Sequence, residues 1–159
     1  MQLNFLVNDM SASQLSFYLI KEINRLTEQL ETSHIDCIVF YENMAQLPIA
    51  PNFAIMQIAE AWAQSEPVVA TSLSTAAKLI DFPATHQKFF YVWDLEWLRG
   101  QRKVYNWYEP IYTNKKLSLI ARSKEHADLI RNAYNRDVCG IVENFKIEDL
   151  INVIRTTRR

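Results

Sequence analysis

Glycine is scarce in this chain: among 159 residues only Gly100 and Gly140 occur. Dinucleotide-binding turns, P-loops and the nucleophile elbow of α/β-hydrolases all need glycines at fixed spacing, because their backbone turns tightly or approaches a ligand closely. The patterns GxGxxG, GxxxxGK[ST] and GxSxG are all missing from the sequence. We therefore expect no phosphate group held by a glycine-rich loop.

An excess of charge of either sign is also missing. The chain has 17 Lys and Arg residues against 18 Asp and Glu residues, so its net charge is -1. No global field draws it to nucleic acid or to an anionic membrane surface, and nucleic acid is not an expected partner. No apolar run approaches the ~20 residues of a membrane span, and the N-terminal sequence MQLNFLVNDM lacks the basic start of a signal peptide. We expect a cytoplasmic protein without a membrane span.

Cysteine and histidine are few. Cys37 and Cys139 both lie in apolar runs, which predicts two buried, reduced thiols that act as small hydrophobic residues. His34, His86 and His126 are scattered without the spacing of metal ligands. The sequence therefore predicts no metal site.

Alternating short apolar runs and helical stripes fill the chain. The composition, with 49% hydrophobic and 22% charged residues, suits one globular domain over residues 1–159. The alternation predicts βαβ units, and hence a three-layer α/β/α sandwich with a mainly parallel, Rossmann- or flavodoxin-like sheet of six or seven strands. Strands are predicted at 3–7, 35–41, 53–58, 68–70, 89–93, 117–121 and 137–142. Helices are predicted at 11–30, 72–80, in part of 95–112 ending at Pro110, at 123–134 and at 147–154.

Seven apolar residues on these stripes and runs are predicted to form the core. Truncating any of them to alanine should cost roughly 2–5 kcal/mol. They are Leu19, Ile23, Val39, Val92, Ile120, Ile130 and Ile151.

The stretch KFFYVWDLEWL, residues 88–98, carries the clearest functional pattern. An apolar run ends at Trp93 and is followed at once by Asp94 and Glu96, with Trp97 beside them. Ligands of open α/β sheets bind just past the carboxyl ends of the strands. Carboxyl groups between indoles have perturbed pKa values, which favours a functional site. An ion pair between Asp94 and either Arg122 or Arg99 is the competing structural explanation.

Polar residues follow the other predicted strands as well. Helix capping explains serines at such positions without any ligand. Because strand ends of a parallel sheet share one edge, we nevertheless expect Asp94, Glu96, Arg122, Ser123 and Asn144 to surround one concave site. The other polar residues that follow predicted strands are Asn8, Asp9, Ser11, Glu42, Asn43, Thr71, Ser72 and Glu143.

The segment 97–116 interleaves aromatic with basic residues. It could stack sugars or bases, or it could simply pack aromatic side chains onto the sheet while its charges stay solvated. Packing onto the sheet is the favoured role for Tyr105 and Tyr108. For Trp97 and Trp107 both roles remain open. A non-catalytic interaction module that uses this segment for protein or nucleic-acid contact is the alternative function.

The last third of the chain resembles a known family. SLIARSKEHADLIRNAYNRDVCGIVENFKIEDL is similar to the end of the N-terminal domain of GT-B glycosyltransferases of the retaining, family-4-like kind. The matching positions are Ser123, Ala127, Ile130, Asn144 and Leu150, and Phe145 stands where the family usually has glycine. VWDLEWL similarly resembles the strand that ends in His-Asp at the acceptor site, with Trp93 replacing the histidine and Asp94 matching.

This resemblance implies an acceptor-side domain. Asp94 would orient or deprotonate an acceptor hydroxyl, and the surrounding residues would bind a sugar or glycosylated acceptor. In that family the nucleotide-sugar is held mainly by a C-terminal domain, whose start would follow the end of this chain. The resemblance therefore implies no tightly bound cofactor, a nucleotide-sugar as co-substrate, and a second glycosyltransferase domain or a homodimer as partner. The expected substrate-binding residues are Trp93, Glu96, Trp97, Arg122, Ser123 and Asn144.

Overall fold

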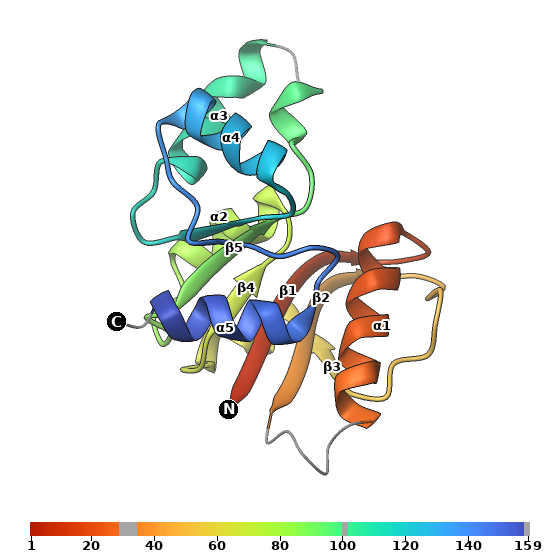
Figure 1. Ribbon diagram of the computed structural model, residues 1–159. Helices are drawn as coiled ribbons and strands as arrows, with labels where there is room; N and C mark the ends of the chain where they lie inside the picture. The colour runs from red at the N-terminus through yellow and green to blue at the C-terminus, as the bar shows by residue number, and fades with distance from the viewer. Residues whose placement is uncertain (29–34, 100–101, 158–159) are drawn as a thin grey trace.

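The computed structural model describes residues 1–28, 35–99 and 102–157 (Figure 1). Gly100, His34 and the predicted helical positions 29 and 30 lie outside these residues. The strands are β1 (Gln2–Met10), β2 (Asp36–Met44), β3 (Ala54–Gln57), β4 (Val68–Ala70), β5 (Lys88–Val92), β6 (Ser118–Ala121) and β7 (Gly140–Ile141). The α-helices are α1 (Gln14–Glu28), α2 (Leu73–Ile80), α3 (Arg102–Tyr112), α4 (Lys124–Tyr134) and α5 (Ile147–Thr157), and the short 3₁₀ helices are η1 (Ile58–Ala63) and η2 (Glu96–Leu98).

The seven strands form one sheet in the order β3-β2-β1-β4-β5-β6-β7, and every neighbouring pair is parallel. The predicted α/β class and the parallel Rossmann-like sheet are therefore confirmed. The chain adds strands on one side of β1 up to β3, and then crosses over to place β4 on the other side. This reversal between β1 and β4 is the topological switch point, where open α/β sheets bind ligands.

Helices cover both faces of the sheet, which explains why the strands read as continuous apolar runs. In β1, Leu3, Phe5 and Val7 face α1 and α5, whereas Leu6 faces the layer of α2 and α4. Figure 1 shows α1 and α5 lying against the same face. All seven residues predicted for the core are at most 3% exposed, so that prediction is confirmed.

The first helix begins later than its sequence pattern predicts. The predicted helix begins at residue 11, but α1 starts at Gln14, and the Ser13 hydroxyl oxygen accepts the backbone N–H of Ser16 at 3.2 Å. The reason is that β1 extends to Met10 by pairing with β2 through Asp9–Asn43 and Met10–Met44. The longer strand moves the turn, and with it the cap, toward the C-terminus.

Helix α3 also departs from its prediction, because it continues past Pro110 to Tyr112. A proline inside a helix removes one backbone hydrogen bond. Here the following residues are held by packing: Ile111 is 5% exposed, and the Tyr112 ring stacks on Tyr134 with centroids 4.5 Å apart. Tertiary burial outweighs the local cost of proline.

Both cysteines were predicted to be buried, and this prediction is wrong for Cys139. Cys37 is buried on β2, whereas Cys139 is exposed. The cause is the position of β7, which pairs only with β6 and spans two residues instead of the six predicted. An edge strand of this length leaves the residues around it open to solvent.

Gly140 on β7 permits close packing of α5. A β-carbon at this position would lie 2.7 Å from Cγ1 of Val153 and closer still to its Cγ2. Valine is stiff about its first side-chain torsion, so it cannot turn away freely. The absence of a side chain at Gly140 therefore sets the distance between β7 and the last helix.

We predict that Gly140→Ala lowers the free energy of unfolding by about 1–3 kcal/mol through overpacking. Val153→Ala should recover part of this loss in the double variant, since it removes the two methyl groups in the way. Urea unfolding of the wild type, both single variants and the double variant measures the coupling. Additive effects of the two substitutions would contradict the proposed contact.

Candidate functional site

A cleft opens at the switch point because the central strand has neighbours of unequal length. Residues Asn4–Leu6 of β1 pair with all three residues of β4, and β4 then ends at Ala70. On its other side β1 remains paired with β2 as far as Met10. The carboxyl end of β1 therefore has an uncovered edge toward β4, beside a cavity of about 470 Å³.

The lining of this switch cleft, as we name it, is polar and acidic. Eight of its eleven described residues have hydroxyl, amide or carboxyl side chains, one has an indole, and none is a lysine or arginine. The eleven are Val7, Asn8, Asp9, Ser11, Ser13, Leu15, Thr71, Ser72, Ser74, Glu96 and Trp107.

The turn from β1 into α1 is organised by a buried serine. Ser16 is fully buried, and its hydroxyl accepts the backbone N–H of Ser11 at 3.2 Å. It also lies 3.2 Å from the Ser13 hydroxyl. Side-chain hydroxyls thus satisfy backbone groups in a turn where many dinucleotide-binding folds place glycines. Without such glycines, the turn presents hydroxyl groups to the cleft.

The turn from β4 into α2 is organised in the same way. The Thr75 hydroxyl accepts the backbone N–H groups of Thr71 and Ser72 at 3.2 and 3.1 Å, and the Ser72 hydroxyl accepts the Thr75 N–H in return. This is a reciprocal capping box. The Thr71 hydroxyl donates to the carbonyl of Leu6 at 2.9 Å, which fixes the turn to β1. One wall of the cleft is therefore rigid.

Glu96 joins this wall from η2. Its carboxylate accepts the backbone N–H of Leu73, at the start of α2, at 3.4 Å. Burial raises the pKa of Glu96, and the nearby charge of Asp94 acts in the same direction, whereas the bond from Leu73 opposes both. A carboxyl group with a raised pKa in a cleft can act as a hydrogen-bond partner or proton acceptor for a ligand hydroxyl.

The opposite wall contributes a second acid, and the rim contributes an indole. The Asp9 carboxylate accepts the Asn43 side-chain N–H at 2.9 Å, so an amide from β2 holds it in place. Trp107 on α3 lines the cleft while 55% of its surface stays exposed. An exposed indole beside carboxylates offers an apolar face to a ligand whose hydroxyls bond to the acids.

Asp94 lies at the same edge of the sheet but outside the lining of the switch cleft. Its carboxylate pairs with Arg99 at 3.0 Å, and the two side chains are 37% and 78% exposed. The competing structural explanation for this acid is therefore present in the fold. Two acids at positions i and i+2 diverge because β5 ends at Val92 and η2 begins at Glu96, so no strand continues through them.

Trp93 packs into an aromatic cluster. Its ring stacks on Phe145, with centroids 5.2 Å apart, and approaches Tyr91 at 6.4 Å. The Arg122 guanidinium lies 3.9 Å from the centroid of the Trp93 ring in a cation–π contact. The hydroxyl of Tyr91 donates to the Val142 carbonyl at 2.6 Å, and burial raises the pKa of this tyrosine to about 12. Trp93 thus joins β5 to the turn before α5.

Trp97 is enclosed by aromatic rings of the helical layer. Its ring meets Tyr112 and Tyr134 edge to face, at centroid distances of 4.7 and 5.0 Å. These contacts position η2 against α3 and α4. They support a packing role for Trp97, and they hold the neighbouring Glu96 at the switch cleft.

Arg122, Ser123 and Asn144 come together at a separate hollow of about 330 Å³, which His126 and Glu143 also line. Arg122 donates to the Asn144 side-chain oxygen at 3.1 Å, and the Ser123 hydroxyl caps α4 by accepting the His126 N–H. The residues predicted from the strand ends therefore share one sheet edge but do not surround one cavity. Glu96 lines the switch cleft, Arg122, Ser123 and Asn144 line the second hollow, and Asp94 lines neither.

Comparisons with family models, with curated proteins and with solved structures found no match to this chain. No helix among the described residues is long and apolar enough to cross a membrane. No group of three His, Cys, Asp or Glu side chains suited to a metal ion occurs in the part of the chain that the structure describes.

Of the residues predicted to form the site, Glu96 alone lines the switch cleft. The lining residues Asn8, Asp9, Ser11, Thr71 and Ser72 belonged only to the wider set of polar residues after strands, and Ser13, Ser74 and Trp107 belonged to neither group. Ser13 and Ser74 lie at the starts of helices, where serine is a common cap, and Trp107 was considered only as part of the segment 97–116. A serine-rich pair of turns after the first and fourth strands was the available signal. Linking Trp107 to these turns requires the packing of α3 on α2, which the sequence does not specify.

We predict that Glu96→Gln stabilises the protein at pH 7. Burial disfavours the ionised carboxylate, so the pKa of Glu96 is higher in the folded than in the unfolded state. At neutral pH the carboxylate is ionised in the unfolded state, and the cost of burying its charge lowers the free energy of unfolding of the wild type. The difference should vanish as pH falls below the ordinary glutamate range, where both states are protonated. Chemical unfolding from pH 3 to 8 tests this, with exposed Glu60→Gln as the charge control. A stabilisation that is independent of pH would contradict it.

A second prediction concerns Phe145, which is fully buried at a positive φ of 58°. Glycine adopts this conformation without strain, whereas alanine does not. Both Phe145→Ala and Phe145→Gly should lose about 3–5 kcal/mol of ring packing. We expect the glycine variant to be the more stable of the two by about 0.5–1 kcal/mol. Thermal or urea unfolding of the pair decides the order, and a more stable alanine variant would refute it.

Proposed function

We propose that this chain binds a sugar or a sugar-bearing acceptor in the switch cleft, as the acceptor-side domain of a GT-B-like glycosyltransferase. The observation that carries the proposal is the lining: two carboxylates, several hydroxyls and an exposed indole around one cavity at the ligand-binding edge of a Rossmann-like sheet. Sugars present hydroxyls to polar groups and apolar ring faces to aromatic side chains, which matches this set.

The charge of the cleft supports a neutral ligand. Asp9 and Glu96 are acidic, and the described lining residues include no lysine or arginine. A phosphate group there would face like charges, and the described residues that line the cleft offer it no cationic side chain. The nucleotide part of a nucleotide-sugar co-substrate would therefore be held by a second domain or another subunit, as the resemblance implies.

The proposal assigns the acid–base role to Glu96 in place of Asp94. Glu96 lines the cleft and is half-buried, so its carboxylate can accept the proton of an acceptor hydroxyl. Asp94, paired with Arg99 at the surface, would influence Glu96 through its charge. Trp107 would support the ring of the acceptor.

The backbone at Phe145 also supports the resemblance. The family usually has glycine at this position, and here the residue adopts the left-handed conformation that glycine favours. Asn144, which matches the asparagine of the family, is left-handed as well, with φ at 45°. The turn retains the backbone shape of a glycine turn although a phenylalanine occupies it.

We expect saturable binding of neutral saccharides to the purified chain, measured by tryptophan fluorescence and calorimetry with a panel of methyl glycosides and oligosaccharides. Trp107→Ala should weaken binding about three- to tenfold, the value of one aromatic contact. Trp62→Ala is the matched control, because Trp62 is a similarly exposed indole on η1 that packs on Phe82. Equal losses in both variants, or no binding, would contradict the proposal.

A further prediction separates the acceptor role from a donor role. Neutral saccharides should bind more tightly than the nucleotide-sugars UDP-glucose and GDP-mannose. Glu96→Gln should reduce this difference in affinity, because it removes a negative charge from the cleft. Turnover by the isolated chain should be absent or very slow, because transfer needs donor and acceptor to be held together. Tight, selective binding of a nucleotide-sugar would assign the cleft to the donor.

The interaction-module alternative rests on a different observation. On the segment 97–116, Leu98 and Trp107 are exposed apolar residues, at 61% and 55%. A contiguous patch of such side chains would mark a contact surface. Failure of every saccharide to bind, with the fold intact, would favour this alternative.

A further inference from the structure

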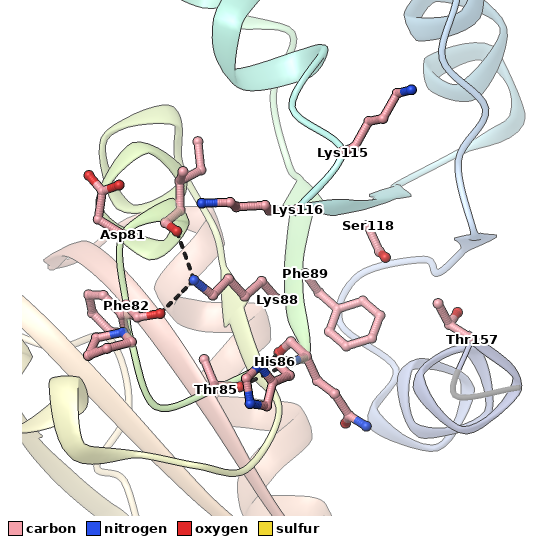
Figure 2. A pocket seen from close by; sticks show the side chains of 13 residues that line it. Asp81, Phe82, Thr85, His86, Lys88, Phe89, Lys115, Lys116, Ser118 and Thr157 are labelled. Carbon is pink, nitrogen blue, oxygen red and sulfur yellow. Dashed lines mark hydrogen bonds between the residues drawn. The ribbon is translucent and has the colours of Figure 1, made fainter.

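A second and larger cavity lies at the opposite edge of the sheet. It measures about 620 Å³ and sits between the end of α2, the first residues of β5 and β6, and the end of α5 (Figure 2). The proposed function does not use it. Its lining is basic, with three lysines (Lys88, Lys115 and Lys116) against one acid, Asp81.

Lys88 is fixed at the wall of this amino-edge cavity. Its ammonium donates to the carbonyl oxygens of Ile80 and Phe82, at 2.8 and 2.6 Å. These carbonyls lie at the end of α2, where no helical N–H reaches them. An ammonium has three N–H donors, and these two carbonyls are its hydrogen-bond acceptors among the described residues. One donor therefore remains for a ligand.

Lys116 places a second ammonium in the same region. Its backbone N–H bonds to the Asn114 side chain at 2.9 Å, which shapes the turn before β6. Figure 2 shows the Lys116 side chain extending toward Lys88 and Asp81, whereas the Lys115 ammonium points away from them. Burial and the charge of Lys116 lower the pKa of Lys88, and Asp81 offsets this in part. The fold thus holds two like charges close together.

Neither Lys88 nor Lys116 takes part in an ion pair among the described residues. Lys88 and Lys116 against Asp81 leave one positive charge in excess, and the third lysine of the lining, Lys115, raises the excess to two. This positive field attracts a phosphate monoester, which carries about -1.5 to -2 at pH 7. A nucleic-acid backbone would need a longer basic surface to neutralise several phosphates. The charge of the cavity therefore favours a small anion.

We propose that the amino-edge cavity binds a small phosphorylated molecule, with its phosphate between Lys88 and Lys116. The remainder of the ligand would lie along Phe89, Ser118 and Thr157, which Figure 2 shows on the other side of the cavity. A cavity of this size accommodates a ligand as large as a nucleotide or a sugar phosphate.

The experiment is a titration of the ¹⁵N-labelled chain, followed by amide NMR. Inorganic phosphate and pyrophosphate test the anion site alone, and glucose 6-phosphate and AMP distinguish the two sources of a phosphate group. We expect saturable shifts at amides 85–89 and 116–118, with at least one organic phosphate binding more tightly than inorganic phosphate. Absence of saturation, or shifts centred on the switch cleft or on Arg122, would overturn the proposal.

Two neighbouring lysines supply matched variants that leave the cap of α2 intact. Lys116→Gln should weaken pyrophosphate binding about three- to fivefold, as expected for one partly exposed charge contact. Lys115→Gln removes the same charge from the same turn, but its ammonium points elsewhere, so its effect should stay below about twofold. Circular dichroism confirms that both variants fold. Equal weakening by the two substitutions would show diffuse attraction instead of a site, and would refute the proposal.

Discussion

The unequal pairing of β1 is the constraint on which the candidate site depends. This strand extends to Met10 against β2, whereas β4 accompanies it only through Leu6. Because β4 ends early, the chain turns into α2 beside an open edge of β1, and the cleft lies between the two. The contact of the Thr71 hydroxyl with the Leu6 carbonyl secures the place where the strands separate. Lengthening β4 by a few residues would pair the open edge and close the site.

Hydroxyl side chains replace glycine in both turns that border this cleft. Ser16 and Thr75 accept backbone N–H groups at the starts of α1 and α2. In a glycine-rich turn, those N–H groups would face an anionic ligand. Here they are occupied by the protein's own oxygens, and the cleft displays hydroxyls and carboxylates. In the proposed function, this shortage of glycine disfavours a phosphate group in the switch cleft and leaves its hydroxyls and carboxylates for a neutral, hydroxyl-rich ligand.

The fold was predictable from the sequence to a greater extent than the site. Apolar periodicity located the buried residues such as Val39, Val92 and Ile130, because burial on both faces leaves a strong local pattern. Strand lengths were less predictable, since β1 and β7 depend on the neighbours they pair with. Asp94 and Glu96 looked equivalent in sequence. Because the chain breaks between β5 and η2, Asp94 pairs with Arg99 and Glu96 accepts the N–H of Leu73. That break depends on tertiary structure.

The two cavities carry opposite charge, with carboxylates at the switch cleft and lysines at the amino-edge cavity. The proposed function requires the switch cleft to hold a sugar. The most direct measurement is a crystal structure of the chain soaked with the saccharide that binds best in solution. We expect a sugar ring against Trp107, with its hydroxyls within hydrogen-bond distance of Asp9 or Glu96. A sugar bound elsewhere on the molecule, with the cleft filled by solvent alone, would contradict it.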